Sequence, residues 1–338
     1  MRFDKHPNNP ILSPLKDNDW ESLAVCNPGV IHHDGLFHML YRAAGHDLEH
    51  RIVLGYATSE DGANFVRQSD TPAVSPDEGS FDAGCVEDPR IVTIDGLHVI
   101  TYAYRPFPPG RYWLKESYDH GWALPESAPN GLLWNTTNTG LMITRDFKRF
   151  KKLGRITQHD IDNRDVILFP EKINGKFVML HRPVEWTGPD YGTDVPTMWL
   201  AFSDDLMRWR DDHLLAVPEQ PWEMKKMGGS TPPLKTEHGW LVLYHAVSPE
   251  DEQYRVGAML LDLHNPRIIL ARTKDFLMEP EFPYETDGYY TGCVFPTGNV
   301  ILDDTLYVYY GGADRYVCQA TCKVSELIET LLRDGKRT

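Results

Sequence analysis

Short apolar runs alternate with turn residues along almost the whole chain, and apolar residues at helical spacing are rare. A typical unit runs from the apolar segment 91–94 through the Asp95-Gly96 pair to the apolar segment 98–102. Apolar runs of this length bounded by Gly, Pro, Asn or Asp are typical of strands, and an Asp-Gly pair between two of them is typical of a hairpin. The pattern therefore predicts a chain made mainly of antiparallel strands.

This strand–turn–strand unit recurs five times, and each copy has a proline near its first strand. The intervals between the five prolines are 61, 81, 62 and 64 residues, and the prolines are Pro28, Pro89, Pro170, Pro232 and Pro296. Five similar units of this length indicate a repeat architecture. We expect an all-β fold, a five-bladed β-propeller that forms one domain over residues 1–338. A two-sheet sandwich would not produce five similar units.

Two segments depart from the repeat. The longer second interval predicts an insertion at 106–138 that covers one face of the molecule. The segment 324–332 carries apolar residues at helical spacing, which predicts a short C-terminal helix.

The composition argues against several classes of partner. The net charge is −15, from 49 acidic and 34 basic residues, so we expect neither nucleic acid nor an anionic membrane surface as a partner. No run of about 18 apolar residues is present, which predicts no membrane span. The five cysteines lack zinc-type spacing and the first residues lack the apolar stretch of a signal peptide. We therefore expect reduced thiols, no bound metal and a cytoplasmic protein.

Charged residues gather where the predicted first strands begin, most clearly at Glu87-Asp88-Pro89-Arg90. Buried in a core, these charges would cost several kcal/mol unless paired, whereas at the mouth of a site one carboxyl can act as an acid or base. A surface loop with a local ion pair is the alternative for this segment. In a propeller the first strands surround one channel, so the polar residues at their entrances and at the ends of the second strands should converge. The candidates are Asn27, Arg42, Asp88, Arg90, Arg164, Lys172, Arg182, His245 and Asp314, and Arg105 and Asp165 occupy comparable positions.

These candidates divide into an acidic and a basic group. The acidic group suits glycoside cleavage and comprises Asp88 with Glu87, Glu171 and Asp314. In the basic group, Arg164, Arg182 and His245 would be explained by an anionic ligand such as phosphate, because guanidinium forks match phosphate oxygens. The sequence has no Gly-rich phosphate loop and no dinucleotide fingerprint, so a nucleotide is not expected.

The same segments resemble glycoside hydrolase family 130, the mannoside phosphorylases and related mannosidases. The matching segments follow one another along almost the whole chain: 27–29, 41–43, 87–90, 165–172, 181–183, 231–233, 239–245 and 309–314. The resemblance implies a five-bladed propeller that needs no cofactor and uses inorganic phosphate as co-substrate. Because members of the family are often oligomers, it also implies a homo-oligomer.

The resemblance further implies a role for individual residues. Asp88 matches the catalytic acid of the family, and Arg164, Arg182 and His245 match its phosphate-binding positions. The residues expected to hold the mannosyl unit are Asn27, Arg42, Arg90, Lys172 and Asp314. The implied reaction is inverting phosphorolysis of a β-1,2- or β-1,4-mannoside to α-mannose 1-phosphate and a shortened sugar.

Two other functions stay open. An inverting β-mannosidase on the same fold would need a second carboxylate to activate water, and Glu171 or Glu281 could serve as that base. A sugar-binding propeller without activity is the third possibility. The basic group favours phosphorolysis, and the segments 228–233 and 289–296 look more like β-1,2-mannobiose phosphorylases than β-1,4 enzymes.

Overall fold

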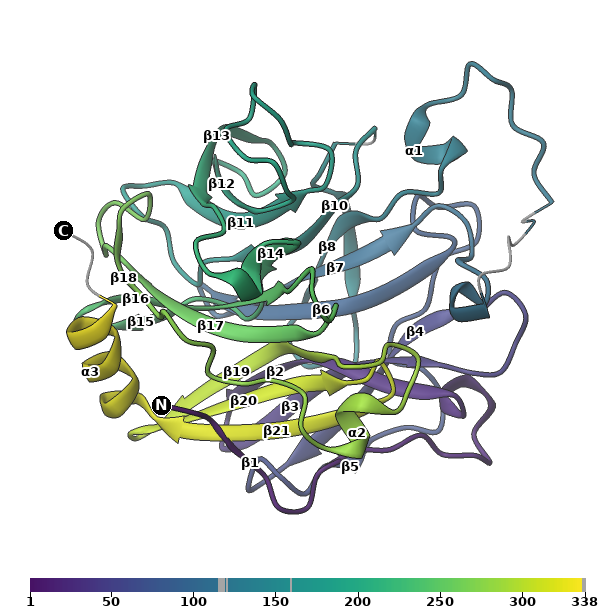
Figure 1. Cartoon of the computed structure of the whole chain (residues 1–338). Helices are drawn as coiled ribbons and strands as arrows, with labels where there is room; N and C mark the ends of the chain where they lie inside the picture. The colour runs from purple at the N-terminus through teal and green to yellow at the C-terminus, as the bar shows by residue number, and fades with distance from the viewer. Residues whose placement is uncertain (115–118, 120, 159, 336–338) are drawn as a thin grey trace.

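Antiparallel strands dominate the structure, which confirms the predicted all-β fold. The computed structural model describes residues 1–114, 119, 121–158 and 160–335 (Figure 1). Within them, the longest helix is the C-terminal α3 (Val324–Asp334), so the predicted terminal helix is also confirmed. The other helical segments are short: η1 (Asp19–Glu21), η2 (Tyr112–Leu114), α1 (Asn130–Leu133), η3 (Pro221–Glu223) and α2 (Pro283–Thr286).

The strands form antiparallel groups that follow one another along the chain. The first contains β2 (Ala24–His33), β3 (Leu36–Ala44), β4 (Ile52–Ser59) and β5 (Val66–Arg67). The second contains β6 (Cys85–Ile94), β7 (Leu97–Arg105), β8 (Asn138–Thr144) and β9 (Lys151–Arg155). A parallel pair between Ile52 and Cys85 joins these two groups into one hydrogen-bonded sheet.

The remaining strands make three further groups. The third contains β10 (Asn163–Leu168), β11 (Phe177–Pro183), β12 (Met198–Ser203) and β13 (Trp209–Ala216). The fourth contains β14 (Lys226–Gly229), β15 (Leu234–Thr236), β16 (Gly239–Val247), β17 (Tyr254–Leu261) and β18 (Ile269–Arg272). The fifth contains β19 (Val294–Leu302), β20 (Thr305–Gly312) and β21 (Tyr316–Lys323), with β1 (Asp4–Lys5) paired to β21.

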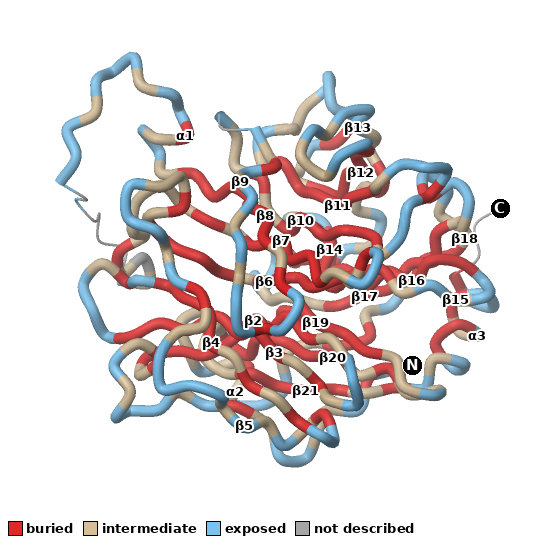
Figure 2. Tube along the Cα trace, turned by 180° about the vertical axis from the view of Figure 1, so that it is seen from behind, coloured by how far each residue is buried: buried red, intermediate tan, exposed pale blue. Residues whose placement is uncertain are grey.

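Neighbouring groups contact one another through their inner strands, which lie in the middle of the molecule in Figure 1. Figure 2 shows buried residues along these strands and exposed residues mainly along the connecting loops. Hydrogen bonds between groups join Thr297 Oγ1 to Pro28 O at 3.0 Å, Thr101 Oγ1 to Val166 O at 2.6 Å, Arg90 Nε to Ser230 O at 3.2 Å and Asn299 Nδ2 to Thr231 Oγ1 at 2.7 Å.

A buried tyrosine on the inner part of each group, except the third, donates its hydroxyl to a buried carboxylate, which also pairs with a cation. A carboxylate in a core is costly unless it is paired and hydrogen-bonded, and these sets satisfy that need. In the third group, His181 and Asp212 stand at the corresponding place, 3.2 Å apart. The four sets are Tyr41–Glu21–Arg67, Tyr102–Asp82–Lys152, Tyr244–Glu223–Arg272 and Tyr310–Glu285–Lys5.

The predicted insertion is present between β7 and β8, although residues 115–118 and 120 lie outside the described part of it. None of the helices described is long and apolar enough to span a bilayer. No group of three metal-ligating side chains occurs in the described ranges. All five cysteines are buried and free.

Candidate active site

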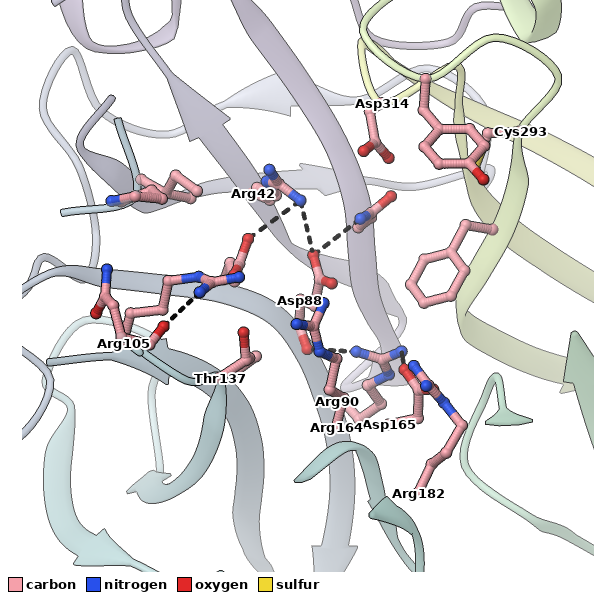
Figure 3. Close-up of a pocket in the computed structure, with 18 of the residues that line it drawn as sticks. Arg42, Asp88, Arg90, Arg105, Thr137, Arg164, Asp165, Arg182, Cys293 and Asp314 are labelled. Atoms are coloured by element: carbon pink, nitrogen blue, oxygen red, sulfur yellow. Dashed lines mark hydrogen bonds and ion pairs between the residues drawn. The ribbon is translucent and has the colours of Figure 1, made fainter. Parts of the chain in front are cut away.

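A pocket of about 630 Å³ opens at the end of the molecule where β2, β6 and β10 begin. A cavity of this size suits a small ligand such as a disaccharide with an anion. Seven of the nine predicted site residues line it: Asn27, Arg42, Asp88, Arg90, Arg164, Arg182 and Asp314. Figure 3 shows most of them pointing toward one another from different strand groups.

Three β-bulges aim polar side chains into this pocket. The strand register shifts next to Asn27 in β2, Asp88 in β6 and Asp165 in β10. Each of these residues has a left-handed backbone, with φ of 46°, 53° and 53° respectively. Asn and Asp tolerate this conformation better than other non-glycine residues, and a bulge redirects the side chain of the extra residue. The bulge explains why these residues face the pocket in three successive groups.

Asp88 lies in the middle of a network of polar contacts. Asn27 Nδ2 donates to its Oδ1 at 2.8 Å, and Arg42 Nη1 lies 3.6 Å from the same oxygen. Arg42 Nη1 also pairs with Glu87 Oε2 at 3.1 Å, and Arg90 Nη1 donates to the backbone oxygen of Asp88 at 2.7 Å. Burial raises the pKa of Asp88 to about 6, Glu87 adds to this effect, and Arg42 opposes it. A carboxyl with this pKa can carry a proton near neutral pH, as a general acid must.

Asp314 reaches the same part of the pocket from the fifth strand group, as Figure 3 shows beside Arg42. Its backbone is also left-handed, with φ of 54°. Burial raises its pKa, while the charge of Arg42 opposes the rise. A carboxyl that lines the pocket can exchange hydrogen bonds with a neutral polar ligand such as a sugar hydroxyl.

Cationic side chains line the other side of Asp88. Arg164 is held by Asp162 through two hydrogen bonds of 2.6 and 2.5 Å, and Arg182 Nε donates to Asp165 Oδ2 at 2.6 Å. Burial alone would raise the pKa of Asp165, but the positive charges around it, Arg182 first, hold that pKa well below its usual range. Asp165 is therefore ionised, and it orients Arg182, which lines the pocket.

Lys226 at the start of β14 adds a further cation to this side of the pocket. Its Nζ donates to Tyr254 Oη at 2.6 Å. Burial, reinforced by the charge of Arg182, lowers its pKa to about 8. An ammonium close to its titration point in a cationic site gains from an anion, because the anion offsets both the repulsion and the desolvation.

The family follows from comparison with known proteins. A family model described as β-1,4-mannooligosaccharide phosphorylase matches residues 2–112 and 133–333. The chain belongs to glycoside hydrolase family 130. It is similar to the 1,2-β-oligomannan phosphorylase of Thermoanaerobacter sp. strain X514, with 36% identity over 97% of this chain and 99% of the relative.

Two further members of the family support the assignment. The β-1,2-mannobiose phosphorylase of the same Thermoanaerobacter strain is 36% identical over 94% of this chain and 96% of the relative. The solved β-1,2-mannobiose phosphorylase of Listeria innocua, in complex with β-1,2-mannobiose, superposes with a TM-score of 0.79 at 26% identity. The superposition covers 98% of this chain and 99% of the Listeria chain. The family match omits residues 113–132, so it leaves out most of the insertion.

Two predicted site residues of this family member do not line the pocket. Lys172 is exposed, and its Nζ lies over the ring of Phe177, 4.4 Å from the centroid. It comes seven residues after Asp165, beyond the far end of β10, and a strand rises by about 3.3 Å per residue away from the pocket. The expected contact between Lys172 and the mannosyl unit is therefore not supported by its position.

His245 is fully buried behind Asp165 instead of facing the pocket. Its Nε2 lies 3.4 Å from Asp165 Oδ2, and Ser230 Oγ lies 3.2 Å from its Nδ1. Burial lowers its pKa to about 3, so the imidazole is neutral at pH 7. Gly228 makes this packing possible, because a Cβ there would lie 2.4 Å from Asp165 Oδ2. His245 is thus placed to position Asp165, and does not add a charge to the cationic side.

Lys226 is a charged pocket residue that the sequence analysis did not single out. Lys226 lies six residues before Pro232, the proline that marks the fourth unit, so the repeat gives no signal for it. Asp165 also lines the pocket, and it shares with Asn27 and Asp88 a position just inside the first strand of its group.

Proposed function

We propose that this protein is an inverting β-mannoside phosphorylase whose single catalytic domain is a five-bladed β-propeller. The observation that carries the proposal is the presence, in one pocket, of an acid with a pKa of about 6 and a cluster of cations. Asp88 is that acid, and the cations on its far side are Arg164, Arg182 and Lys226. The relatives with 36% identity, which are named as phosphorylases of β-1,2-mannosides, support the same function.

The propeller is supported by the arrangement of the strands. Each of the five predicted units corresponds to one antiparallel group, and inner-strand contacts link each group with others, including the fifth with the first through Thr297 and Pro28. Five such groups packed around a common centre would place all their first strands at the pocket. The contributions of every group to the pocket lining agree with that geometry.

In the proposed complex, the mannosyl unit lies against Asn27, Arg42, Arg90 and Asp314. Arg42 and Asn27 both contact Asp88, so the sugar would be held next to the acid. Phosphate would bind to Arg164, Arg182 and Lys226, with His245 acting through Asp165. Arg forks match phosphate oxygens, and Lys226 adds a point charge.

The reaction is a single displacement. A phosphate oxygen forms a bond to the anomeric carbon while the bond from this carbon to the glycosidic oxygen breaks, and Asp88 supplies the proton to the departing oxygen. The configuration inverts, so a β-mannoside gives α-mannose 1-phosphate. Phosphate is already an anion and needs no base, whereas an inverting hydrolase must activate water with a second carboxylate.

The proposed bases of a hydrolase are poorly placed for that task. Glu171 and Glu281 are exposed and do not line the pocket; they pair with Lys235 at 2.5 Å and Lys5 at 2.7 Å. Their positions favour phosphorolysis over the inverting β-mannosidase. We propose β-1,2-linked mannosides as the substrates, on the names of the relatives. We also propose that the protein is a homo-oligomer in the cytoplasm. The five free, buried thiols support the cytoplasmic location.

Product analysis with β-1,2- and β-1,4-mannobiose tests this function. We expect release of α-mannose 1-phosphate that depends on added phosphate and is faster with the β-1,2 linkage. Equal cleavage in phosphate-free buffer would support the hydrolase instead. A faster reaction of the β-1,4 linkage would overturn the linkage assignment but leave the phosphorylase standing.

A further inference from the structure

The insertion between β7 and β8 brings apolar surface to the mouth of the pocket. Trp134 is 65% exposed, yet it lines the pocket together with Leu133, Pro108 and Pro109. A large ring left in water beside a polar cavity has no role in the core. Such a surface is typical of a place where a ligand packs.

The backbone that carries Trp134 is held firmly. Asn135 has a left-handed backbone with φ of 48°, and its side chain bonds the main chain of Phe107 in both directions, at 3.0 Å each. Arg105 Nη1 donates to Asn135 O at 2.5 Å, and Thr136 N donates to Gly131 O at 3.0 Å. These hydrogen bonds join the two ends of the insertion, so they fix the backbone next to Trp134.

The first arm of the insertion is fixed to loops of other strand groups. Gly110 N donates to Glu49 O at 3.0 Å, and the ring of Trp113 packs against His50 at 4.6 Å and against Tyr289 at 4.9 Å between centroids. Both arms of the insertion are thus tied down at the pocket mouth. The described ends of the insertion form a preorganised part of the site wall, which lowers the entropy cost of binding a ligand there.

The position of this wall relative to Asp88 tells which part of the substrate it meets. Figure 3 shows Arg105 and Thr137, which flank the base of the insertion, on one side of Asp88 and Arg182 on the other. In a single displacement with inversion, the nucleophile and the leaving group occupy opposite faces of the reacting carbon. With phosphate on the Arg182 side, the leaving sugar lies on the Arg105 side, where Trp134 stands.

We propose that Trp134 is the platform on which the leaving sugar of the mannoside packs, and that it sets the acceptor preference of the reverse reaction. The inference rests on the proposed phosphorylase function. The apolar C–H face of a pyranose complements the indole ring, and the ring is stiff, so little rotamer entropy is lost on packing. Residues 113–132 lie outside the family match, whereas Leu133 and Trp134 lie just inside it.

The test uses W134A with W134F and W122A as matched variants. Trp122 lies in the same insertion, is 69% exposed and does not line the pocket. In the synthetic direction, with α-mannose 1-phosphate as donor, we expect W134A to raise the KM for acceptor mannose about tenfold, W134F to restore most of the loss, and W122A to match the wild type. The KM values for α-mannose 1-phosphate and phosphate should stay within about twofold.

Several results would overturn the platform. They are a wild-type acceptor KM in W134A, an equal change in W122A, or a change in subunit number with no change in acceptor KM, which would make Trp134 an interface residue. Absence of any phosphate-dependent activity in the wild-type protein would instead reject the proposed function. The two failures are therefore distinguishable.

Discussion

Replacement of Asp88 by asparagine removes the proposed proton donor and keeps the size of the side chain. The ordinary aspartate pKa of 3.8 would leave Asp88 protonated in fewer than about one molecule in a thousand at pH 7, whereas a pKa of about 6 leaves it protonated in about a tenth. Burial of the carboxyl thus raises the active fraction by about two orders of magnitude. We expect D88N to lower kcat on mannobiose by about 100- to 10,000-fold, the usual contribution of a general acid.

The assay is phosphorolysis of β-1,2-mannobiose and of a β-mannoside with a nitrophenol leaving group, each at saturating phosphate. A nitrophenolate departs without a proton, so the loss in D88N should be less than about tenfold on that substrate. The wild-type rate should fall as the pH rises through about 6, because Asp88 then loses its proton, and this fall should be absent in D88N.

Glu87 provides a matched control in the same pocket. Its negative charge raises the pKa of Asp88, and it also holds Arg42 at 3.1 Å. E87Q should therefore move the alkaline limb of the pH profile to lower pH. Its activity on mannobiose should still require a protonated Asp88. The reasoning fails if D88N retains more than about a tenth of the mannobiose activity, or if both leaving groups lose the same factor.

Two more predictions concern the cationic side and the core. R182A should raise the KM for phosphate by about 10- to 100-fold, from the loss of charge-assisted hydrogen bonds. K172A should behave as wild type, because that side chain is exposed and does not line the pocket. Phosphate titrations compare the two variants, and equal effects would refute the assignment. E223Q should lower the free energy of unfolding by about 3 kcal/mol, since it leaves Arg272, only 3% exposed, without its 2.7 Å partner. Urea unfolding measures this loss, Y244F should cost only about 1 kcal/mol, and a smaller loss in E223Q than in Y244F would contradict the pairing.

The alternation of short apolar runs and turn pairs predicted the strand-rich fold, because a hairpin is specified by nearby residues. The position of proline, however, does not mark the first strand in every group. Pro28 and Pro89 do lie in first strands, but Pro170 follows the end of β10. The feature common to the three groups is a left-handed Asn or Asp at a bulge, and in the third group this is Asp165.

That shift of register explains why Lys172 lies outside the pocket while Asp165 lines it. The seven pocket residues that were predicted share a simple signal, a charged or amide side chain near the start of a first strand or the end of a second strand. His245 shares the signal too, but a pattern of residue types does not report depth, and packing of Gly228 against Asp165 places the imidazole one layer behind the pocket. The sequence pattern did not predict the buried pairs of tyrosine and carboxylate, because the tyrosine lies in a strand and the carboxylate about 20 residues away along the chain.

The central claim is that phosphate, and not water, attacks the mannoside. The most direct measurement is an NMR time course of wild-type enzyme with β-1,2-mannobiose and phosphate, in which phosphorus and anomeric proton signals are followed together. The account predicts one mannose 1-phosphate and one mannose for each mannobiose cleaved. One phosphate is consumed, and the 1-phosphate forms as the α anomer. Two mannose molecules for each mannobiose, with phosphate unchanged, would contradict it.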